Sequence, residues 1–192
     1  MIYQSMSGDA ADGTGVFNCK NSDLKILEES KVYKTAPMFF ITNTKAVINL
    51  NDCRIKYGSN TFLDIKGTTE WGNEGSNGGE VTLNLDNQEI EGDITIDNIS
   101  SLSIVMKNSK IKGTINGNKK ATSLSISLDS TSTITLTGNS YYTSLKNDVS
   151  SGDNIVKGDY TFTEYTNEEE DKSTSKGSFI GLSMLLVLLV LF

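Results

Sequence analysis

Two neighbouring segments of the chain carry the same pattern of side chains: residues 81–96 read VTLNLDNQEIEGDITI, and residues 102–115 read LSIVMKNSKIKGTI. When the two are aligned, apolar residues recur in one frame with a spacing of 21 residues. The matching pairs are Val81 and Leu102, Leu83 and Ile104, Leu85 and Met106, Ile90 and Ile111, and Ile94 and Ile115, and Gly92 matches Gly113. A repeat of this length is the size of one structural unit of a repeat protein, so we interpret the chain as an array.

Further copies of the repeat lie on both sides of this pair. Residues 124–138, LSISLDSTSTITLTG, continue the frame at a spacing of 22 that grows to 23. Degraded earlier copies hold Ala46, Ile48, Leu50 and Ile55, and before them Phe17, Cys19, Leu24 and Ile26. The spacing between these copies stretches to 31 and 35 residues, which requires insertions. Residues 67–79, GTTEWGNEGSNGG, are rich in Gly and Asn and predict one such insertion, a protruding loop.

Each copy alternates apolar and polar residues, which places the apolar side chains on one face of a β-strand. No helical period occurs before residue 179. A unit of about 21 residues is too short for a propeller blade but fits one coil of a β-solenoid. The alternative is an antiparallel sandwich, in which nothing requires the same residue types to recur in one frame. The prediction is therefore an all-β solenoid of about five to six coils over residues 1–165.

Several segments carry a resemblance to a known family. YQSMSGDA at residues 3–10, FFITNT at 39–44 and SNGG at 76–79 before a VTLNL strand resemble the right-handed parallel β-helix, pectate-lyase-like surface proteins of adhesin type. The resemblance covers about residues 2–165. It implies a right-handed parallel β-helix, and it implies that these coils lie within a longer solenoid.

The densest apolar block is the last fourteen residues, 179–192, which read FIGLSMLLVLLVLF. As a helix they would be about 21 Å long, against a hydrocarbon core of roughly 30 Å. A polar acidic linker, residues 166–178, precedes them and offers Ser173, Thr174 and Ser175 as small residues for GPI attachment. A marginal transmembrane anchor is the alternative, and a packed terminal helix is the least favoured because it has no polar face.

The N-terminal residues lack the basic and apolar regions of a secretory signal. A GPI signal requires export, so we expect the sequence to be a fragment, or Met1 not to be the true start. The expected location is the cell surface, with attachment to the membrane. Asn98 begins an Asn-Ile-Ser glycosylation pattern. Cys19 and Cys53 fit either one disulfide or two free buried thiols.

Composition excludes several chemistries. The chain has no His, so neither a His-based catalytic triad nor a His-ligated metal site can form. It carries 17 Lys and Arg against 24 Asp and Glu, a net charge of -7, without basic clusters. Nucleic acid is therefore not an expected partner.

Parallel β-helices also include polysaccharide-degrading enzymes, but a catalytic role requires specific residues. Arg54, Ile55 and Lys56 match the short RIK string of polygalacturonases, but its partner motifs are missing and Ile55 falls on an inward position. A lyase needs a Lys or Arg base and usually Ca²⁺ held by converging carboxylates. Asp86, Asp93, Asp97 and Asp129 fall in turns or on outward positions, and Arg54 is the only Arg. No catalytic residue, metal or cofactor is expected.

The loop at 67–79 holds the only Trp, Trp71, followed by Asn73 and Glu74. An exposed aromatic ring beside amide and carboxylate groups suits stacking on sugars. The alternative is that Trp71 covers the edge of a coil.

The leading hypothesis is a non-enzymatic surface solenoid with an adhesive or structural role, in contact with the membrane and with surface polysaccharide. The alternatives are a lyase-like enzyme and a carbohydrate-binding module. A groove of converging carboxylates and Lys would favour the enzyme, and a flat Ser/Thr/Asn face the scaffold.

Overall fold

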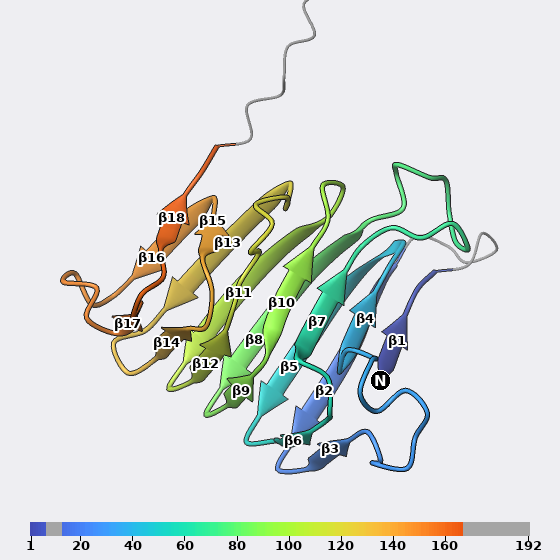
Figure 1. Ribbon diagram of the computed structural model, residues 1–192, viewed down its shortest axis with the longest axis horizontal. Helices are drawn as coiled ribbons and strands as arrows, with labels where there is room; N and C mark the ends of the chain where they lie inside the picture. Colours follow the sequence, from blue (N-terminus) through green and yellow to red (C-terminus); the bar gives the residue numbers. More distant parts are fainter. Residues whose placement is uncertain (7–12, 167–192) are drawn as a thin grey trace, which may run out of the picture.

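The computed structural model describes residues 1–6 and 13–166 (Figure 1). Within these residues the chain is all-β, with eighteen strands and no helix. It follows that no helix of the described part is long and apolar enough to cross a membrane. The apolar tail at 179–192, the GPI candidates and all but the first residue of the linker at 166–178 lie outside the described residues.

The strands form five sheets. The six-stranded sheet holds, in spatial order, β16 (Ser144–Asn147), β13 (Ser123–Leu128), β11 (Ser101–Lys107), β8 (Gly79–Asp86), β5 (Thr44–Asn51) and β2 (Thr14–Lys20). The sheet that we call the β4 sheet holds β1 (Ile2–Gln4), β4 (Phe39–Ile41), β7 (Thr61–Ile65) and β10 (Asp93–Ile96). The β12 sheet holds β17 (Ile155–Val156), β14 (Thr133–Leu136), β12 (Lys110–Gly113) and β9 (Glu89–Glu91). Two short pairs complete the set: β3 (Asp23–Lys25) with β6 (Arg54–Lys56), and β15 (Ser140–Tyr142) with β18 (Phe162–Glu164).

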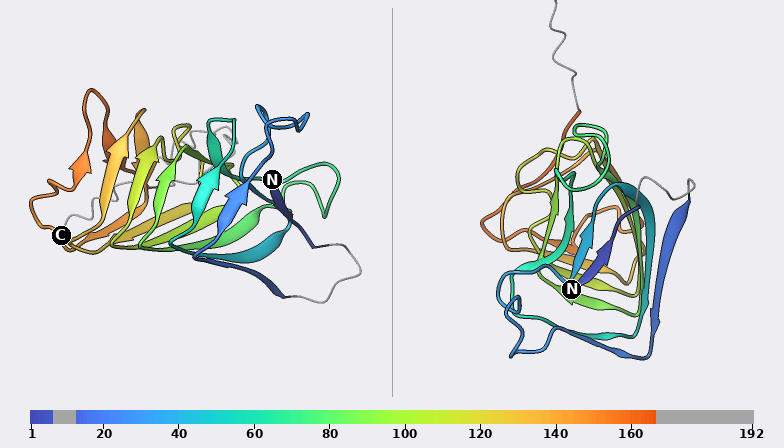
Figure 2. Two further views of the ribbon diagram at one scale, coloured as in Figure 1. Left: turned by 90° about the horizontal axis from the view of Figure 1, so that it is seen from below. Right: turned by 90° about the vertical axis from the view of Figure 1, so that its right-hand side faces the viewer.

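Every strand pairing in the described residues is parallel. The chain visits the sheets in turn, so that β7, β8 and β9 are followed by β10, β11 and β12, which pair with them. We call one such passage a round. Viewed toward one end, the sheets surround a common interior (Figure 2). The antiparallel sandwich is therefore wrong, and the arrangement is compatible with the expected parallel β-helix.

The register of the six-stranded sheet follows the sequence repeat. Ile104 lies opposite Leu83 on one side and Ile126 on the other, and Ile48 continues this row on β5. The alternate residues of each strand point inward, where a single cluster of buried apolar side chains runs through the molecule. Alternation therefore gives each strand one face for the core and one for the solvent.

Asn and Asp residues set the corner that follows four of the six strands of the six-stranded sheet. Asn21, Asp52, Asn87 and Asn108 come directly after β2, β5, β8 and β11, and their φ angles are 48°, 52°, 49° and 45°. Asn and Asp tolerate this left-handed conformation better than other residues with a side chain. The amide of Asn108 also donates a hydrogen bond to Oδ1 of Asn87, at 2.6 Å. The chain can therefore make the same sharp bend in successive rounds.

A disulfide links Cys19 on β2 to Cys53, which lies between β5 and β6. The two residues are 34 positions apart in the sequence and belong to successive rounds. Of the two states left open by the sequence, the structure has the disulfide. It closes a covalent loop around the first round at the open edge of the six-stranded sheet.

Candidate binding surfaces

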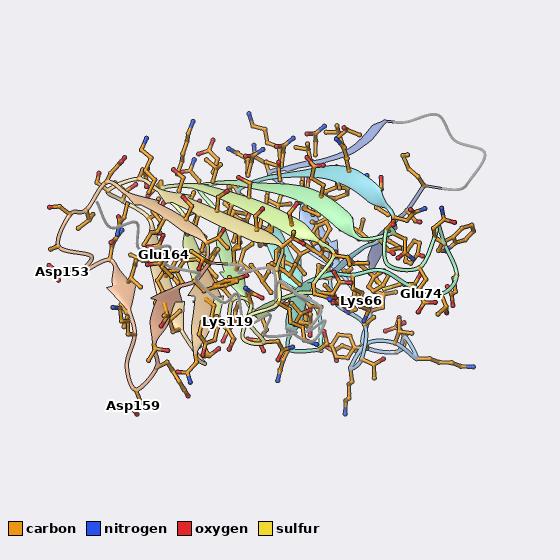
Figure 3. The ribbon with its side chains drawn as sticks, turned by 90° about the horizontal axis from the view of Figure 1, so that it is seen from above. Lys66, Glu74, Lys119, Asp153, Asp159 and Glu164 are labelled. Carbon is orange, nitrogen blue, oxygen red and sulfur yellow. A yellow bond between two sulfur atoms is a disulfide. The ribbon has the colours of Figure 1, made fainter. Side chains whose placement is uncertain are left out.

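The loop between β7 and β8 carries the three residues proposed to bind sugar. No strand occurs over residues 66–78, and β8 begins at Gly79. Trp71 is 40% exposed, and Asn73 and Glu74 are exposed as well. Figure 3 shows Glu74 on this loop at one end of the molecule. No hydrogen bond or ion pair joins the side chains of these three described residues, so the loop presents them separately.

Asn77 holds this loop against the body of the protein. Its side chain is buried, and its amide donates to the carbonyl oxygens of Thr68 and of Trp71, the latter at 2.6 Å. Its own carbonyl oxygen accepts a hydrogen bond from the backbone N–H of Asn43, at 2.8 Å. The loop thus has a buried polar anchor. In the sequence, Asn77 stands out only as part of the SNGG segment, and no role is predicted for it.

A groove of about 670 Å³ lies at the base of this loop. Its lining includes Asn43, Lys45, Ser76, Glu80, Ser101 and Thr122. None of Trp71, Asn73 and Glu74 lines it. Lys45 and Glu80 of this lining form an exposed ion pair, with Nζ and Oε2 3.2 Å apart. The structure therefore separates the proposed sugar-binding residues from the nearest groove.

Small polar side chains line part of the outer face of the six-stranded sheet, and Val16, Val47 and Val105 continue the same rows on other strands. Thr82, Ser103, Ser125 and Ser144 form one row across β8, β11, β13 and β16. Asn18, Asn49 and Asn84 form another across β2, β5 and β8. In this second row the amides of Asn84 and Asn49 each donate to the Oδ1 of the preceding Asn, at 2.7 Å. The face therefore presents an ordered pattern of hydroxyl and amide groups.

A second groove, of about 630 Å³, follows the corner between the β12 and β4 sheets. Its lining brings together Lys56, Tyr57, Glu91, Asp93, Lys112 and Thr114. Both lysines are already paired: Lys56 Nζ lies 2.6 Å from Glu28, and Lys112 Nζ lies 2.7 Å from Glu91. Of the four outward Asp residues that the sequence offered as converging carboxylates, only Asp93 lines this groove.

Hydrogen bonds also occupy the other polar groups of this second groove. Oδ1 of Asp93 accepts from the backbone N–H of Thr114, at 2.8 Å. The hydroxyl of Tyr57 donates to the carbonyl oxygen of Glu91. Burial raises the pKa of Tyr57, and the charges of Asp93 and Glu91 raise it further. The Tyr57 hydroxyl therefore stays protonated at neutral pH and is unsuited to act as a base.

The outer face of the β4 sheet carries an aromatic and charged cluster that was not predicted from the sequence. The rings of Tyr3 and Phe40 stack with centroids 5.3 Å apart, and Lys66 Nζ lies 5.3 Å from the Phe40 centroid. Lys66 also pairs with Asp64 at 2.7 Å, and the Thr95 hydroxyl donates to Asp64 at 2.7 Å. Figure 3 labels Lys66 in this cluster. The sequence did contain one indication of this cluster: the alternation in FFI and TFLDI places Phe40 and Asp64 on the outer face of their strands.

The RIK string lies on the exposed surface. The side chain of Arg54 pairs with Asp23 at 2.6 Å, and this hydrogen bond and charge raise the pKa of Arg54 and lower that of Asp23. Ile55 points toward the core and is half-buried. Among the residues that the structure describes, no three His, Cys, Asp or Glu side chains gather closely enough to hold a metal ion.

The glycosylation candidate Asn98 is exposed, in the connection between β10 and β11. Ser100 of the same pattern is buried, and its hydroxyl oxygen accepts a hydrogen bond from the backbone N–H of Gly79, at 3.0 Å. The side chain of Asn98 is therefore accessible to solvent in the folded protein, whereas the Ser serves to join two rounds.

Comparison with known proteins finds no matching family model, no matching curated protein and no matching solved structure. The parallel all-β architecture therefore rests on the structure itself.

Proposed function

We propose that this chain is a right-handed parallel β-helix of about six rounds, of the pectate-lyase-like adhesin type. The support is the repeated order of strands, in which each round pairs in parallel with the one before it. Connections between parallel strands of one sheet are right-handed in about 98% of cases. The buried rows of Ile, Leu and Val would then run along the axis of the rod.

The proposed role is that of a non-enzymatic surface protein with an adhesive or structural function. The single observation that carries it is the outer face of the six-stranded sheet, where Thr82, Ser103, Ser125 and Ser144 line up in register. These small polar side chains give the face many hydrogen-bonding groups, and a hollow of about 420 Å³ lined by Asn18, Asn49 and Asn84 lies on the same face. Such a surface suits extended contact with a hydroxyl-rich polymer better than enclosure of a small substrate.

Charge pairing supports this role over catalysis. The lysines of the groove beside Tyr57 are paired with Glu28 and Glu91, so neither is free to serve as a base. The carboxylate of Asp93 accepts a backbone hydrogen bond. A lyase-like enzyme remains the alternative function, and Asp93 is the residue of this groove on which that alternative is tested.

The partners that we propose are surface polysaccharides, through the Ser/Thr/Asn face and Trp71, and a membrane, through the apolar tail at 179–192. The location would be the cell surface. Trp71 is exposed on its loop, as contact with a sugar ring requires.

The test compares binding with turnover on the same polymers. The full chain is incubated with pectic and other cell-surface polysaccharides, with and without Ca²⁺, and both co-sedimentation and unsaturated products are measured. We expect binding without products. Ser125→Glu, in the centre of the face, should weaken the binding, whereas Lys157→Glu, away from that face, should leave it unchanged. Product formation that Asp93→Asn abolishes would establish the enzyme instead.

A further inference from the structure

The hollow on the outer face of the six-stranded sheet, of about 420 Å³, crosses several rounds. Figure 1 shows β2, β5, β8 and β11 side by side, and residues of all four strands line the hollow. Along one side of it runs the row of Asn18, Asn49 and Asn84. The hollow therefore follows the direction in which the rounds stack, and its shape suits a ligand that extends across several of them.

The amides of this row keep hydrogen-bonding groups for a ligand. Asn84 donates to Asn49, and Asn49 donates to Asn18, both at 2.7 Å. An Asn side chain has two N–H donors, so the amides of Asn49 and Asn84 each retain a second donor that forms no hydrogen bond with the described residues. Neighbouring strands lie about 4.8 Å apart, which is close to the length of one sugar ring in an extended glycan chain. Successive sugars can therefore meet successive amides.

Two lysines stand at the two ends of the opposite side of the hollow. Lys20 on β2 and Lys107 on β11 are separated by three strand spacings, about 14 Å in all. Both side chains are exposed, and neither forms an ion pair with the residues that the structure describes. Asp86, which lies beside Lys107 in the register, accepts a hydrogen bond from the Asn51 amide at 2.9 Å. The hollow therefore holds two available ammonium groups and one carboxylate that already has a partner.

The whole sheet shares this excess of positive charge. Its six strands contain four lysines and two acidic residues, in a chain whose net charge is -7. Lys45 is paired with Glu80. The other three, Lys20, Lys107 and Lys146, form no ion pair within the described part of the chain, whereas the three lysines of β6 and β12 are each paired with a glutamate. This face therefore attracts anionic groups locally.

We propose that this hollow binds an anionic polysaccharide, whose sugars carry carboxylate or sulfate groups. The ammonium groups of Lys20 and Lys107 pair with the anionic groups, and the amides of Asn49 and Asn84 donate hydrogen bonds to sugar hydroxyls. A neutral glycan would leave the lysines unused, and a ligand recognised by charge alone would leave the amides unused. The inference rests on the polysaccharide contact proposed above, and it adds the class of polymer and its place on the face.

Affinity electrophoresis in native gels tests this inference with polymers that share a backbone and differ in charge. Carboxymethyl cellulose is compared with hydroxyethyl cellulose, and dextran sulfate with dextran, so that the two pairs distinguish carboxylate from sulfate. The full chain is kept in a mild non-ionic detergent because of its apolar residues 179–192. We expect at least one charged polymer to retard the chain more than its neutral counterpart does. This difference should decrease at higher salt, which screens the exposed lysines.

Charge-matched variants locate the site. The double variant Lys20→Gln, Lys107→Gln should weaken binding to the charged polymer by roughly threefold to tenfold, the effect of losing two exposed ion pairs. The control is Lys25→Gln, Lys157→Gln, which removes the same charge outside the six-stranded sheet and should leave the binding unchanged.

The variant Asn84→Val tests the amide row and should also weaken the binding to the charged polymer. Valine fits this position, because Val105 occupies the same row on β11. Circular dichroism verifies that each variant is folded.

The outcomes separate this inference from the adhesive role. Equal retardation by the charged and the neutral polymer of both pairs would overturn the inference and leave the adhesive role standing. Retardation by none of the polymers would overturn the inference together with the polysaccharide contact on which it rests. An equal loss of binding in the two lysine double variants would overturn the inference, because overall charge would then govern binding. Equally tight binding of single-stranded DNA would overturn it as well, since charge alone would then be sufficient.

Discussion

Leu83 on β8 and Ile104 on β11 lie directly opposite each other in parallel register, and both side chains are fully buried. They are 21 residues apart, the spacing of the sequence repeat. Each side chain therefore fills a core position in its own round and packs against the side chain at the same position in the neighbouring round.

Ile104→Ala should lower the free energy of unfolding by about 2–5 kcal/mol, because it removes buried methyl groups and leaves a cavity between two rounds. Val105→Ala, on the outer face of the same strand, is the control and should change stability by no more than about 0.5 kcal/mol. Urea denaturation followed by circular dichroism measures both. Equal effects of the two substitutions would contradict the assignment of the inner row.

The disulfide between Cys19 and Cys53 should stabilise the first two rounds. The double variant Cys19→Ala, Cys53→Ala should lose about 2–4 kcal/mol, since a cross-link restricts the unfolded chain. Reduction of the wild type by dithiothreitol should have a similar effect and should leave the double variant unchanged. An unaltered denaturation midpoint after complete reduction would show that the disulfide does not contribute to stability.

Asn21 tests the role of the left-handed corners. Its φ is 48°, and its side chain is exposed. Asn21→Ala should destabilise the protein by about 1 kcal/mol, because Ala pays a steric penalty in this conformation. Asn21→Gly should cost less than Asn21→Ala, because Gly has no Cβ. Thermal denaturation of the three proteins would give this order, and a Gly variant less stable than the Ala variant would contradict it.

Asp129 should make the protein sensitive to acid. Burial by itself raises its pKa, but hydrogen bonds from Ser132, the Asn108 N–H and Thr131 together lower it below the ordinary value. A lowered pKa in the folded state means that the charged form favours folding. This contribution is complete above the unfolded pKa of about 3.9, and it is lost as the pH falls through the lower folded pKa. Asp129→Asn should reduce stability at pH 7 and flatten the decline of stability below pH 4.

Acid denaturation of wild type and Asp129→Asn, followed by tryptophan fluorescence and circular dichroism, measures this difference. Asp159→Asn is the matched control, because Asp159 is exposed and no hydrogen bond to its carboxylate occurs in the described residues. Parallel acid curves for wild type and Asp129→Asn would contradict the role of Asp129.

Alternation and the 21-residue spacing were sufficient to predict an all-β array and its inner rows. The apolar residues recur because each meets its counterpart in the next round, as Leu83 meets Ile104. The corners were predicted only as turns. Asn21, Asp52, Asn87 and Asn108 were visible in the sequence, but their common left-handed geometry becomes evident only when the rounds are aligned.

The candidate sites were harder to predict, because side chains from distant segments build them. The cluster of Tyr3, Phe40 and Lys66 joins three strands or their ends, with up to 63 positions between its members. The alternation of residues along one strand predicts that the side chain of Phe40 points outward. It does not predict which charged side chain lies over the Phe40 ring. Asn77 likewise has a structural role as a loop anchor that composition alone does not reveal.

The register of the six-stranded sheet is the feature on which the whole account depends, and solution NMR of the isotopically labelled protein tests it most directly. We expect nuclear Overhauser effects between backbone protons of Ile104 and those of Leu83 on one side and Ile126 on the other, in the pattern of parallel strands. An antiparallel pattern, or a parallel pattern centred on residues other than Leu83 and Ile126, would contradict the stacked rounds and the proposals that follow from them.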